Sequence, residues 1–314
     1  MKKFIVKRIL QLLPILIGIT VLTFLLLSAS GTDAVDVLEH NTGGTWTTEQ
    51  KTEARKKLGI DQSLPQQYVN WVKKFIKGDM GNSYISGEPV SSVLKEKVPA
   101  TVLLMICSII GTVVISIPLG ILAAIKQNRF LDYFIRIGTF IGNSLPSFLV
   151  ALLLIYLFSL KLGILPVIGQ TGTLSGVILP ATTLVIAMSA KYIRQVRTTV
   201  LEELGKEYVT GARARGIAER KILLHNVLKS SATVILTMLS LSIGSLLGGT
   251  AVVETIFMWD GVGKMAVDAI LTRDFPVLQA YVVWMAIIFV LINLVTDLLY
   301  HFLDPRVRLQ KGGK

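Results

Sequence analysis

Cysteine and histidine are scarce in this sequence of 314 residues, which has one cysteine and three histidines. The single cysteine, Cys107, excludes a disulfide bond within the chain and a metal site made of several thiolates. The histidines, His40, His225 and His301, stand far apart in the sequence. A membrane-embedded enzyme would need a cluster of histidine, cysteine or acidic residues within its apolar segments, and the sequence has no such cluster.

A phosphate-binding loop is also missing. The segment Gly261-Val262-Gly263-Lys264 resembles the end of one, but that motif requires glycine at position 258 and serine or threonine at 265. The chain has Met258 and Met265 there. It therefore cannot bind ATP by this route, and any ATP that drives it must be bound by partner subunits. No two carboxylates share a spacing that suggests a proton relay, which argues against a proton-coupled transporter.

Apolar residues are abundant. They make up 52% of the chain, charged residues make up 17%, and the mean hydropathy is +0.63. Several runs approach the ~20 apolar residues that a helix needs to cross a bilayer. We therefore predict an all-α integral membrane protein with six membrane-spanning helices, at about 9–29, 101–125, 134–160, 177–200, 233–256 and 277–302. The first run is longer than the ~7–15 apolar residues of a secretory signal, which favours a retained helix.

Basic residues are distributed unevenly between the loops, and the formal net charge is +12. The segment 201–232 alone carries six of them: Lys206, Arg213, Arg215, Arg220, Lys221 and Lys229. The positive-inside rule then places this segment, residues 1–8 and the tail 303–314 in the cytoplasm. Topology and attraction to anionic lipid thus account for the charge, and we expect no nucleic-acid partner.

Residues 30–100 are predicted to form an extracytoplasmic domain with nine basic and nine acidic residues. Thr47 and Gln50 have the spacing of a capping box, ahead of a helix that ends at Gly59. A second helix is predicted from Pro65 to Gly78, with aromatic residues on one side and lysines on the other. Its apolar side fits contact with the helix bundle or with headgroups, and the domain could also receive an extracytoplasmic binding protein.

The stretch 202–232 has more structure than a connection between two spans requires. It contains a predicted helix that ends at Gly216 and a second helical run from Ala218 to Lys229. Thr210-Gly211-Ala212, three further residues and Gly216 resemble the cytoplasmic loop of ATP-binding-cassette importer permeases, with Glu-Ala replaced by Thr-Gly. In that family the loop docks on the ATPase. The resemblance assigns coupling to the following residues: Glu207, Tyr208, Thr210, Gly211, Ala212, Ala214 and Gly216.

The segments 254–263 and 273–279 and the closing Leu303-Asp304-Pro305-Arg306 resemble the dipeptide, oligopeptide and nickel branch of the same family. Asp260 stands where members usually carry proline, although Asp-Gly still forms turns. The resemblance implies a permease core over 101–302, located in the plasma or inner membrane of a bacterial cell. It also implies four kinds of partner: a homologous second permease, two cytoplasmic ATP-binding subunits that hold ATP and Mg, an extracytoplasmic substrate-binding protein, and membrane lipid. It implies no catalytic residue, no metal site and no cofactor in this chain.

Seven residues are candidates for the substrate path or for a subunit interface: Asn143, Ser144, Gly244, Gly248, Glu254, Asn293 and Asp297. Small residues four apart, as at Gly138 and Gly142 or at Gly244 and Gly248, allow helices to approach closely, either within the chain or at a second permease. Asn293, Asp297 and His301 form a polar stripe, for which the alternative is an interfacial Asp paired with Arg. Pro118 and Pro146 predict kinks.

The substrate is left open between nickel, a metal bound to a chelator, and short peptides. The donors within the predicted spans are sparse, so we expect a polar, weakly selective passage in which none of them holds a metal tightly: Met105, Met188, Met238, Met285, Cys107, Asn143, Asn293 and Asp297. Specificity then resides in the binding protein. The rival from a different class is a secondary transporter or channel that works alone, which would leave 202–232 unexplained.

Overall fold

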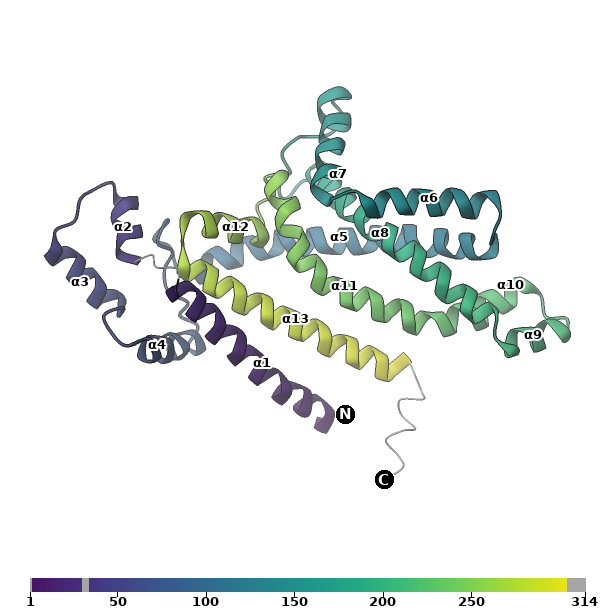
Figure 1. Cartoon of the computed structure of the whole chain (residues 1–314), viewed down its shortest axis with the longest axis horizontal. Helices are drawn as coiled ribbons and strands as arrows, with labels where there is room; N and C mark the ends of the chain where they lie inside the picture. The colour runs from purple at the N-terminus through teal and green to yellow at the C-terminus, as the bar shows by residue number, and fades with distance from the viewer. Residues whose placement is uncertain (1, 30–33, 304–314) are drawn as a thin grey trace. The chain divides into compact units, whose positions relative to one another are not determined.

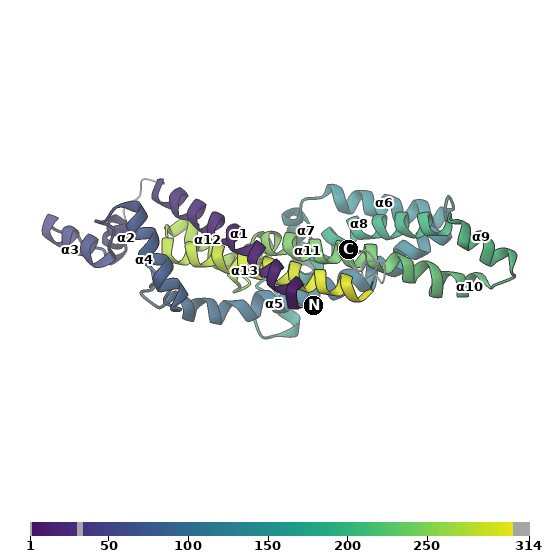
Figure 2. The same ribbon diagram turned by 90° about the horizontal axis from the view of Figure 1, so that it is seen from below.

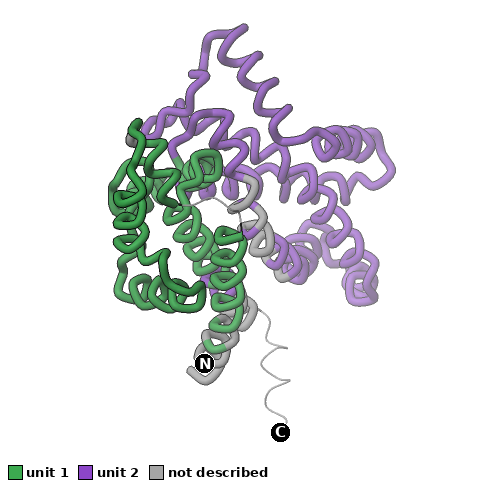
Figure 3. Tube along the Cα trace, turned by 60° about the vertical axis from the view of Figure 1, so that its left-hand side comes forward, with its two compact units in different colours: residues 1–100, 261–290 green, residues 101–260, 291–314 purple. Residues whose placement is uncertain are grey.

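The structure is a computed structural model that describes the backbone of residues 2–29 and 34–303. Within these ranges, some side chains of the first helix and of the last two long helices lie outside the description, as does that of residue 42. The chain divides into two compact units, one of residues 1–100 and 261–290 and one of residues 101–260 and 291–314 (Figure 3).

The first unit begins with the long helix α1 (Lys2–Ala29) and three short helices, α2 (Ala34–Thr42), α3 (Thr48–Leu58) and α4 (Leu64–Ile76) (Figure 1). The predicted capping box of α3 is confirmed. Thr47 Oγ1 accepts a hydrogen bond of 3.3 Å from the backbone N–H of Gln50, and the Gln50 side chain accepts one of 2.8 Å from the Thr47 N–H. Gly59 ends α3 at φ 70°, a left-handed conformation that suits glycine.

Helix α4 has the predicted division into an apolar and a basic side. Its rings continue a row that starts on α1: Phe24 lies 5.6 Å from Tyr68, Tyr68 lies 6.2 Å from Trp71, and Trp71 lies 5.3 Å from Phe75, measured between ring centroids. The hydroxyls of Thr20 and Tyr68 share a hydrogen bond of 2.9 Å. The aromatic side of α4 therefore rests on α1, and the lysines opposite are exposed.

The core of the first unit lies where the start of α5 (Val90–Ile125) meets α12 (Val262–Thr272) and the start of α13 (Phe275–Leu303). Buried Val90 and Leu94 pack there with residues of α12 and α13. Asp274, in the turn between α12 and α13, accepts hydrogen bonds from the Ser83 hydroxyl and, at 3.1 Å, from the Tyr84 N–H. This carboxylate ties the loop before α5 to the α12–α13 turn.

The second unit is built around α8 (Leu174–Leu204), the most deeply buried long helix that the description covers. Helix α6 (Phe130–Ser144), helix α7 (Ser147–Leu154) and helix α11 (Leu228–Ile256) pack against it. The later part of α5 also approaches α8 closely. A Cβ added at Gly120 would lie 2.6 Å from Val196 Cβ, and one at Gly111 would lie 2.7 Å from Val185 Cγ2. Any larger residue at these positions would push the two helices apart.

The region of the third predicted span, 134–160, is a bent pair rather than one straight helix. Helix α6 ends at Ser144, and α7 starts after Pro146 and continues as a π-helical stretch, η1 (Ile155–Lys161). The two arms meet at 103°. This angle confirms the kink predicted at Pro146. The kink forms because proline lacks a backbone N–H and disfavours helical backbone at the residue before it. Pro118 lies inside α5, which continues through it as a helix.

Within the described residues, three helices are long and apolar enough to cross a membrane: α5, α8 and residues 275–295 of α13. The number rises to as many as five if each of two bent pairs counts as one span. One pair is α6 with the segment 147–161, and the other is residues 13–29 with 34–41, which meet at 65°. The predicted all-helical, multi-pass class is therefore confirmed, whereas the count of six stays a prediction.

Candidate functional site

The connection between α8 and α11 is helical for most of its length. Helix α8 ends at Leu204, Gly205 caps it, and a short helix, α9 (Glu207–Ala214), follows at once. After a turn come α10 (Glu219–Lys221) and a π-helical stretch, η2 (Ile222–Val227), which runs directly into α11. Figures 1 and 2 both show α9 and α10 beyond the ends of α8 and α11. The segment therefore projects from the end of the second unit.

One side of α9 packs on its own chain. Val209 and Ala212, three residues apart on that side, are completely buried. They belong to a cluster with Val196 and Val200 of α8 and Val227 of η2. Since residues at i and i+3 lie on the same face of a helix, this contact fixes which face α9 turns outward.

A turn at Gly216 reverses the chain after α9. The Gly216 N–H donates to the Arg213 carbonyl at 2.9 Å, and the Ile217 N–H donates to the Ala212 carbonyl at 3.2 Å. Gly216 has φ +75°. These are the two hydrogen bonds and the left-handed residue of a Schellman motif. Ile217 then packs on the buried cluster beneath α9, so the helix is anchored at its end as well as along its inner side.

The outward side of α9 carries most of the residues that the sequence assigned to coupling. Six of them are exposed: Glu207, Tyr208, Thr210, Gly211, Ala214 and Gly216. Ala212 is the exception, since it faces the chain's own core. A Cβ added at Gly211 would meet no atom within 4 Å. The chain thus has room for the alanine that the family motif carries at this position, and replacement of Ala by Gly here leaves the surface flatter rather than relieving a clash.

Charged side chains brace both ends of α9. Glu203, which is 9% exposed, forms an ion pair with Lys206 and accepts a hydrogen bond of 2.9 Å from the Tyr208 hydroxyl. Burial and this bond to Glu203 raise the pKa of Tyr208, so its hydroxyl stays protonated and keeps donating.

At the other end, Arg213 Nε donates to Glu219 Oε1 at 2.5 Å and Nη2 donates to Oε2 at 3.3 Å. The hydrogen bond from Arg213 lowers the pKa of Glu219 below its ordinary value of 4.5. A lowered carboxyl pKa means that the pair is intact above the ordinary value and is lost only as the pH falls through the lowered one. The pair therefore persists throughout the physiological range.

The described residues among those assigned to a path or an interface lie in different surroundings. Asn143 and Ser144 are exposed at the end of α6, where the Ser144 hydroxyl donates to the Phe140 carbonyl at 2.9 Å. Glu254, in the last turn of α11, is fully buried and accepts a 2.8 Å hydrogen bond from Thr101 Oγ1. Gly244 and Asn293 are half-buried. For Gly248 and Asp297 the structure describes only the backbone.

The glycine pair of α6 divides between two environments. A Cβ at Gly142 would lie 3.2 Å from Ala190 Cβ of α8, whereas one at Gly138 would meet nothing within 4 Å. Gly142 therefore serves close packing within this chain.

Sequence analysis missed the side chains that hold α9 in place, Glu203 and Glu219 among them. The signal was present as acidic residues beside a basic block, but sequence spacing alone does not say which basic side chain each one meets. It also missed the ion pair between Asp132 at the start of α6 and Arg197 of α8, in which Nε and Nη2 each donate at 2.7 Å. Asp132 is the one acid in the basic stretch 126–136, which is the signal that could have found it.

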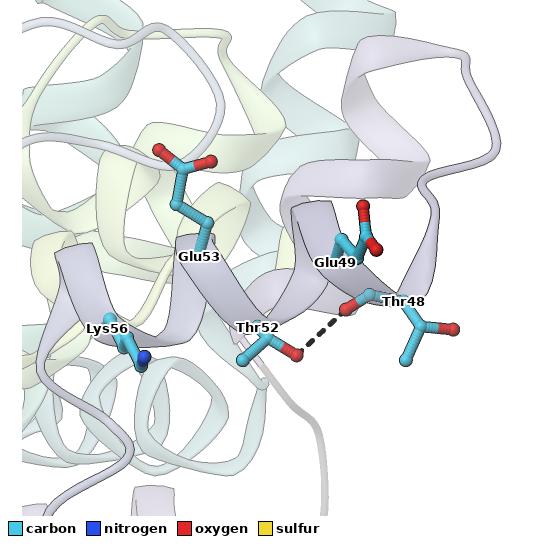
Figure 4. A pocket seen from close by; sticks show the side chains of 5 residues that line it. All are labelled: Thr48, Glu49, Thr52, Glu53 and Lys56. Carbon is cyan, nitrogen blue, oxygen red and sulfur yellow. Dashed lines mark hydrogen bonds between the residues drawn. The ribbon is translucent and has the colours of Figure 1, made fainter.

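A hollow of about 330 Å³ lies on the surface of α3 in the first unit. Figure 4 shows that its lining side chains, Thr48, Glu49, Thr52, Glu53 and Lys56, come from successive turns of one helix. The Thr52 hydroxyl donates to the Thr48 carbonyl of the helix itself at 2.8 Å. All five belong to α3, and among the described residues no second helix contributes to the lining.

Comparison with known proteins places the chain in a family. The family described as "Binding-protein-dependent transport system inner membrane component" matches residues 116–309, and the corresponding family for the N-terminal part of such components matches residues 1–105. The nickel import system permease protein NikB of Staphylococcus aureus is 37% identical over 314 residues, covering 99% of this chain and 94% of the relative. The metal-staphylopine import system permease protein CntB of the same species is 37% identical over 309 residues, covering 98% and 99%.

Solved structures agree at the level of the fold. A chain of the inward-facing methionine transporter MetNI superposes with a TM-score of 0.58 at 17% identity, covering 69% of this chain and 99% of that one. A second crystal form of the same transporter gives a TM-score of 0.57. With the apolar helices and the two matched segments, these findings identify the chain as a multi-pass membrane permease subunit of the binding-protein-dependent family of ATP-binding-cassette importers.

Proposed function

We propose that this chain forms one half of the translocation pathway of an ATP-driven importer for nickel or a small metal chelate. The observation that carries the proposal is the end-to-end similarity to two permeases that are named for nickel and for metal-staphylopine import. A sister permease would supply the other half, an extracytoplasmic binding protein would deliver the substrate, and two cytoplasmic ATPase subunits would supply the energy. The chain itself performs no catalysis.

In this proposal the outward side of α9 is the contact with the ATPase. Its inner side is fixed by Val209 and Ala212, and its end is fixed by the Gly216 turn, so α9 moves together with α8 and α11. A displacement of α9 by the ATPase, through contact with Thr210, Gly211 or Ala214, would therefore move α8 and α11 as well, because no flexible loop separates them from α9. Closure of the ATPase subunits would in this way rearrange the permease, as the docking role of this loop in the family implies.

The proposed topology has six spans with both ends in the cytoplasm. The basic residues of 201–232 support this orientation through the positive-inside rule. The stretch 30–100 is then extracytoplasmic and available to the binding protein. Small residues on α11, at Gly244 and Gly248, are the proposed seam with the sister permease, because close backbone approach drives helix association in lipid.

Selectivity for the metal is proposed to reside in the binding protein rather than in the passage. Two of the methionines are occupied by packing: Met105 is buried, and the Met188 sulfur lies 3.8 Å from Thr112 Oγ1. A polar, weakly selective passage for a metal chelate fits this distribution better than a chain of fixed metal ligands. Short peptides are the alternative substrate within the same branch of the family.

Uptake of labelled nickel tests the proposal. The chain and the subunits encoded beside it would be expressed in cells that lack nickel uptake, and nickel would be offered alone, with a chelator such as histidine, or against excess dipeptide. We expect energy-dependent nickel uptake that dipeptide does not inhibit and that Ala214→Arg, at an exposed position of α9, abolishes. Replacement of Met105, Met188, Met238 and Met285 by leucine, a nearly volume-conserving change, should leave uptake largely intact. Dipeptide uptake without nickel uptake would overturn the proposed substrate.

A further inference from the structure

A cavity of about 390 Å³ opens between α6 and α8 in the second unit. Three arginines line it: Arg136 from α6, and Arg194 and Arg197 from α8. Tyr133, Thr139 and Phe140 of α6 complete its polar and aromatic wall. Three guanidinium groups around one opening require an explanation in a chain that carries so few charges within its long helices.

Within the described part of the chain, only one of the three arginines forms an ion pair. Arg197 makes two hydrogen bonds of 2.7 Å to the fully buried Asp132. Arg136 lies 5.6 Å from the centroid of the Tyr133 ring, which orients its guanidinium without cancelling its charge. Arg136 and Arg194 are both exposed, and neither forms an ion pair with any described carboxylate. The cavity therefore carries a net positive charge that suits an anion.

The setting of the cavity is basic on one side and apolar on the other. Residues 126–136 and 191–197 include six basic residues, Lys126, Arg129, Arg136, Lys191, Arg194 and Arg197, but one acid, Asp132. On α6, Ile137 and Phe140 border the arginines and are 59% and 73% exposed, and Phe134 beside them is 66% exposed. A soluble anion would need only the charged part of this surface. A ligand with a charged head and apolar chains would use both parts.

We propose that this cavity is a binding site for an anionic glycerophospholipid, with the phosphate held by Arg136 and Arg194 and an acyl chain lying along Ile137 and Phe140. The planar guanidinium matches phosphate oxygens with two parallel hydrogen bonds, which makes arginine well suited to such a contact. Basic pockets between membrane helices are known to hold lipid headgroups. In the proposed topology, Arg136 and Arg194 lie at the cytoplasmic ends of the spans 134–160 and 177–200, which is the depth at which headgroups lie.

The lipid would occupy the space between α6 and α8 beside the ion pair of Asp132 and Arg197, which joins the two helices. Its occupation depends on the chain being embedded in a membrane and not on which substrate the importer carries. A failure of this proposal and a failure of the proposed nickel import can therefore be told apart, since lipid retention is measured without transport.

In the test, the full chain is exposed to vesicles of phosphatidylglycerol or of phosphatidylcholine and then purified in mild detergent. Mass spectrometry measures the lipid that the protein retains. The variant Arg136→Gln/Arg194→Gln removes the two arginines without touching the Asp132–Arg197 pair. The matched control Arg129→Gln/Lys191→Gln removes the same charge from the same end but outside the cavity lining. A third arm adds inorganic phosphate in millimolar excess to separate a lipid headgroup from a free anion.

We expect the wild-type chain to retain phosphatidylglycerol in preference to phosphatidylcholine, and phosphate not to displace it. The cavity variant should lose about 100-fold in affinity, because each arginine that makes a charge-assisted hydrogen bond to the phosphate contributes about tenfold. The control should lose at most about 25-fold, because a basic side chain outside the site adds only its general attraction to an anionic surface, about fivefold for each residue. Equal losses in the two variants would reduce the effect to general surface charge and overturn the site. Displacement by phosphate would make the ligand a free anion, and a cysteine at position 136 that crosslinks to a second permease subunit would show that protein covers the cavity. Either result also overturns the proposal.

Discussion

Gly216 differs from Gly211 of helix α9 in its backbone conformation. Its φ of +75° lies in the left-handed region, and nothing lies within 4 Å of an added Cβ. Any cost of a side chain at 216 is therefore backbone strain alone. Gly211 lies within helix α9 and also has open space around it. The two positions thus form a natural pair in which the same substitution should have opposite effects.

We predict that Gly216→Ala destabilises the turn by about 1–2 kcal/mol, the cost of the left-handed conformation for a residue with a Cβ. Gly211→Ala should stabilise α9 by about 0.5–1 kcal/mol, because alanine loses less backbone entropy in a helix than glycine. The measurements are the thermal unfolding midpoint of the purified chain and substrate uptake in cells. Gly216→Ala should lower both values and Gly211→Ala neither. If Gly216→Ala changed neither stability nor uptake, the left-handed turn at Gly216 would not be needed to anchor α9.

At this scale the sequence predicted the turn but not the faces of the helix. The position of Gly216 after a helical run indicated a C-terminal cap, and the structure confirms it. The burial of Ala212 was not predictable in the same way, because Val209 and Ala212 lie three apart and that spacing suits a face turned to the chain's own core as well as one turned to a partner. Only the positions of Val200 and Val227 decide between them.

Helices α6 and α8 are held together by a buried ion pair. Asp132 is fully buried and also accepts a 3.0 Å hydrogen bond from the Asn128 N–H, while the Arg197 side chain is 16% exposed. Both oxygens of the carboxylate therefore have donors. Such a pair contributes little over a well-packed apolar pair, but removal of one member leaves a charge with no partner in a poorly solvated place.

Asp132→Ala should therefore destabilise the chain by about 3 kcal/mol, and the double change Asp132→Ala/Arg197→Met should recover part of that loss. The thermal unfolding midpoint in detergent measures both. Asp132→Asn is the control for size, since it keeps the shape and the acceptor for Asn128. If Asp132→Ala unfolds at the wild-type temperature, the pair does not hold α6 to α8 and the contact must rest on apolar packing alone.

Hydropathy located the long helices well because burial in lipid needs about 20 apolar residues and little else. It could not show the 103° bend between α6 and α7. Pro146 predicted a kink, but the size of the angle depends on how Leu145 leaves the helix and on how α7 packs against α8 and α11.

For the whole molecule, the topology makes a direct prediction about access from outside the cell. In a chain with Cys107 replaced by alanine, cysteines at Lys51 and Lys264 should react with an impermeant maleimide added to intact cells, because both lie on the proposed extracytoplasmic side. Cysteines at Arg213 and Lys311 should react only after the membrane is opened. Labelling at Arg213 in intact cells would overturn the six-span arrangement and with it the assignment of α9 to the ATPase.

Site-directed crosslinking between α9 and an ATPase subunit tests whether the outward side of α9 is the contact with the ATPase. Single cysteines at Thr210, Gly211 and Ala214, all exposed, would be introduced into the chain without Cys107, and the assembled importer would be treated with a short bifunctional reagent in its membrane. We predict a crosslinked product with the ATPase from these three positions. As a control, a cysteine at the exposed Leu224 of η2 should give none. A product from Leu224, with none from Thr210, Gly211 or Ala214, would contradict it.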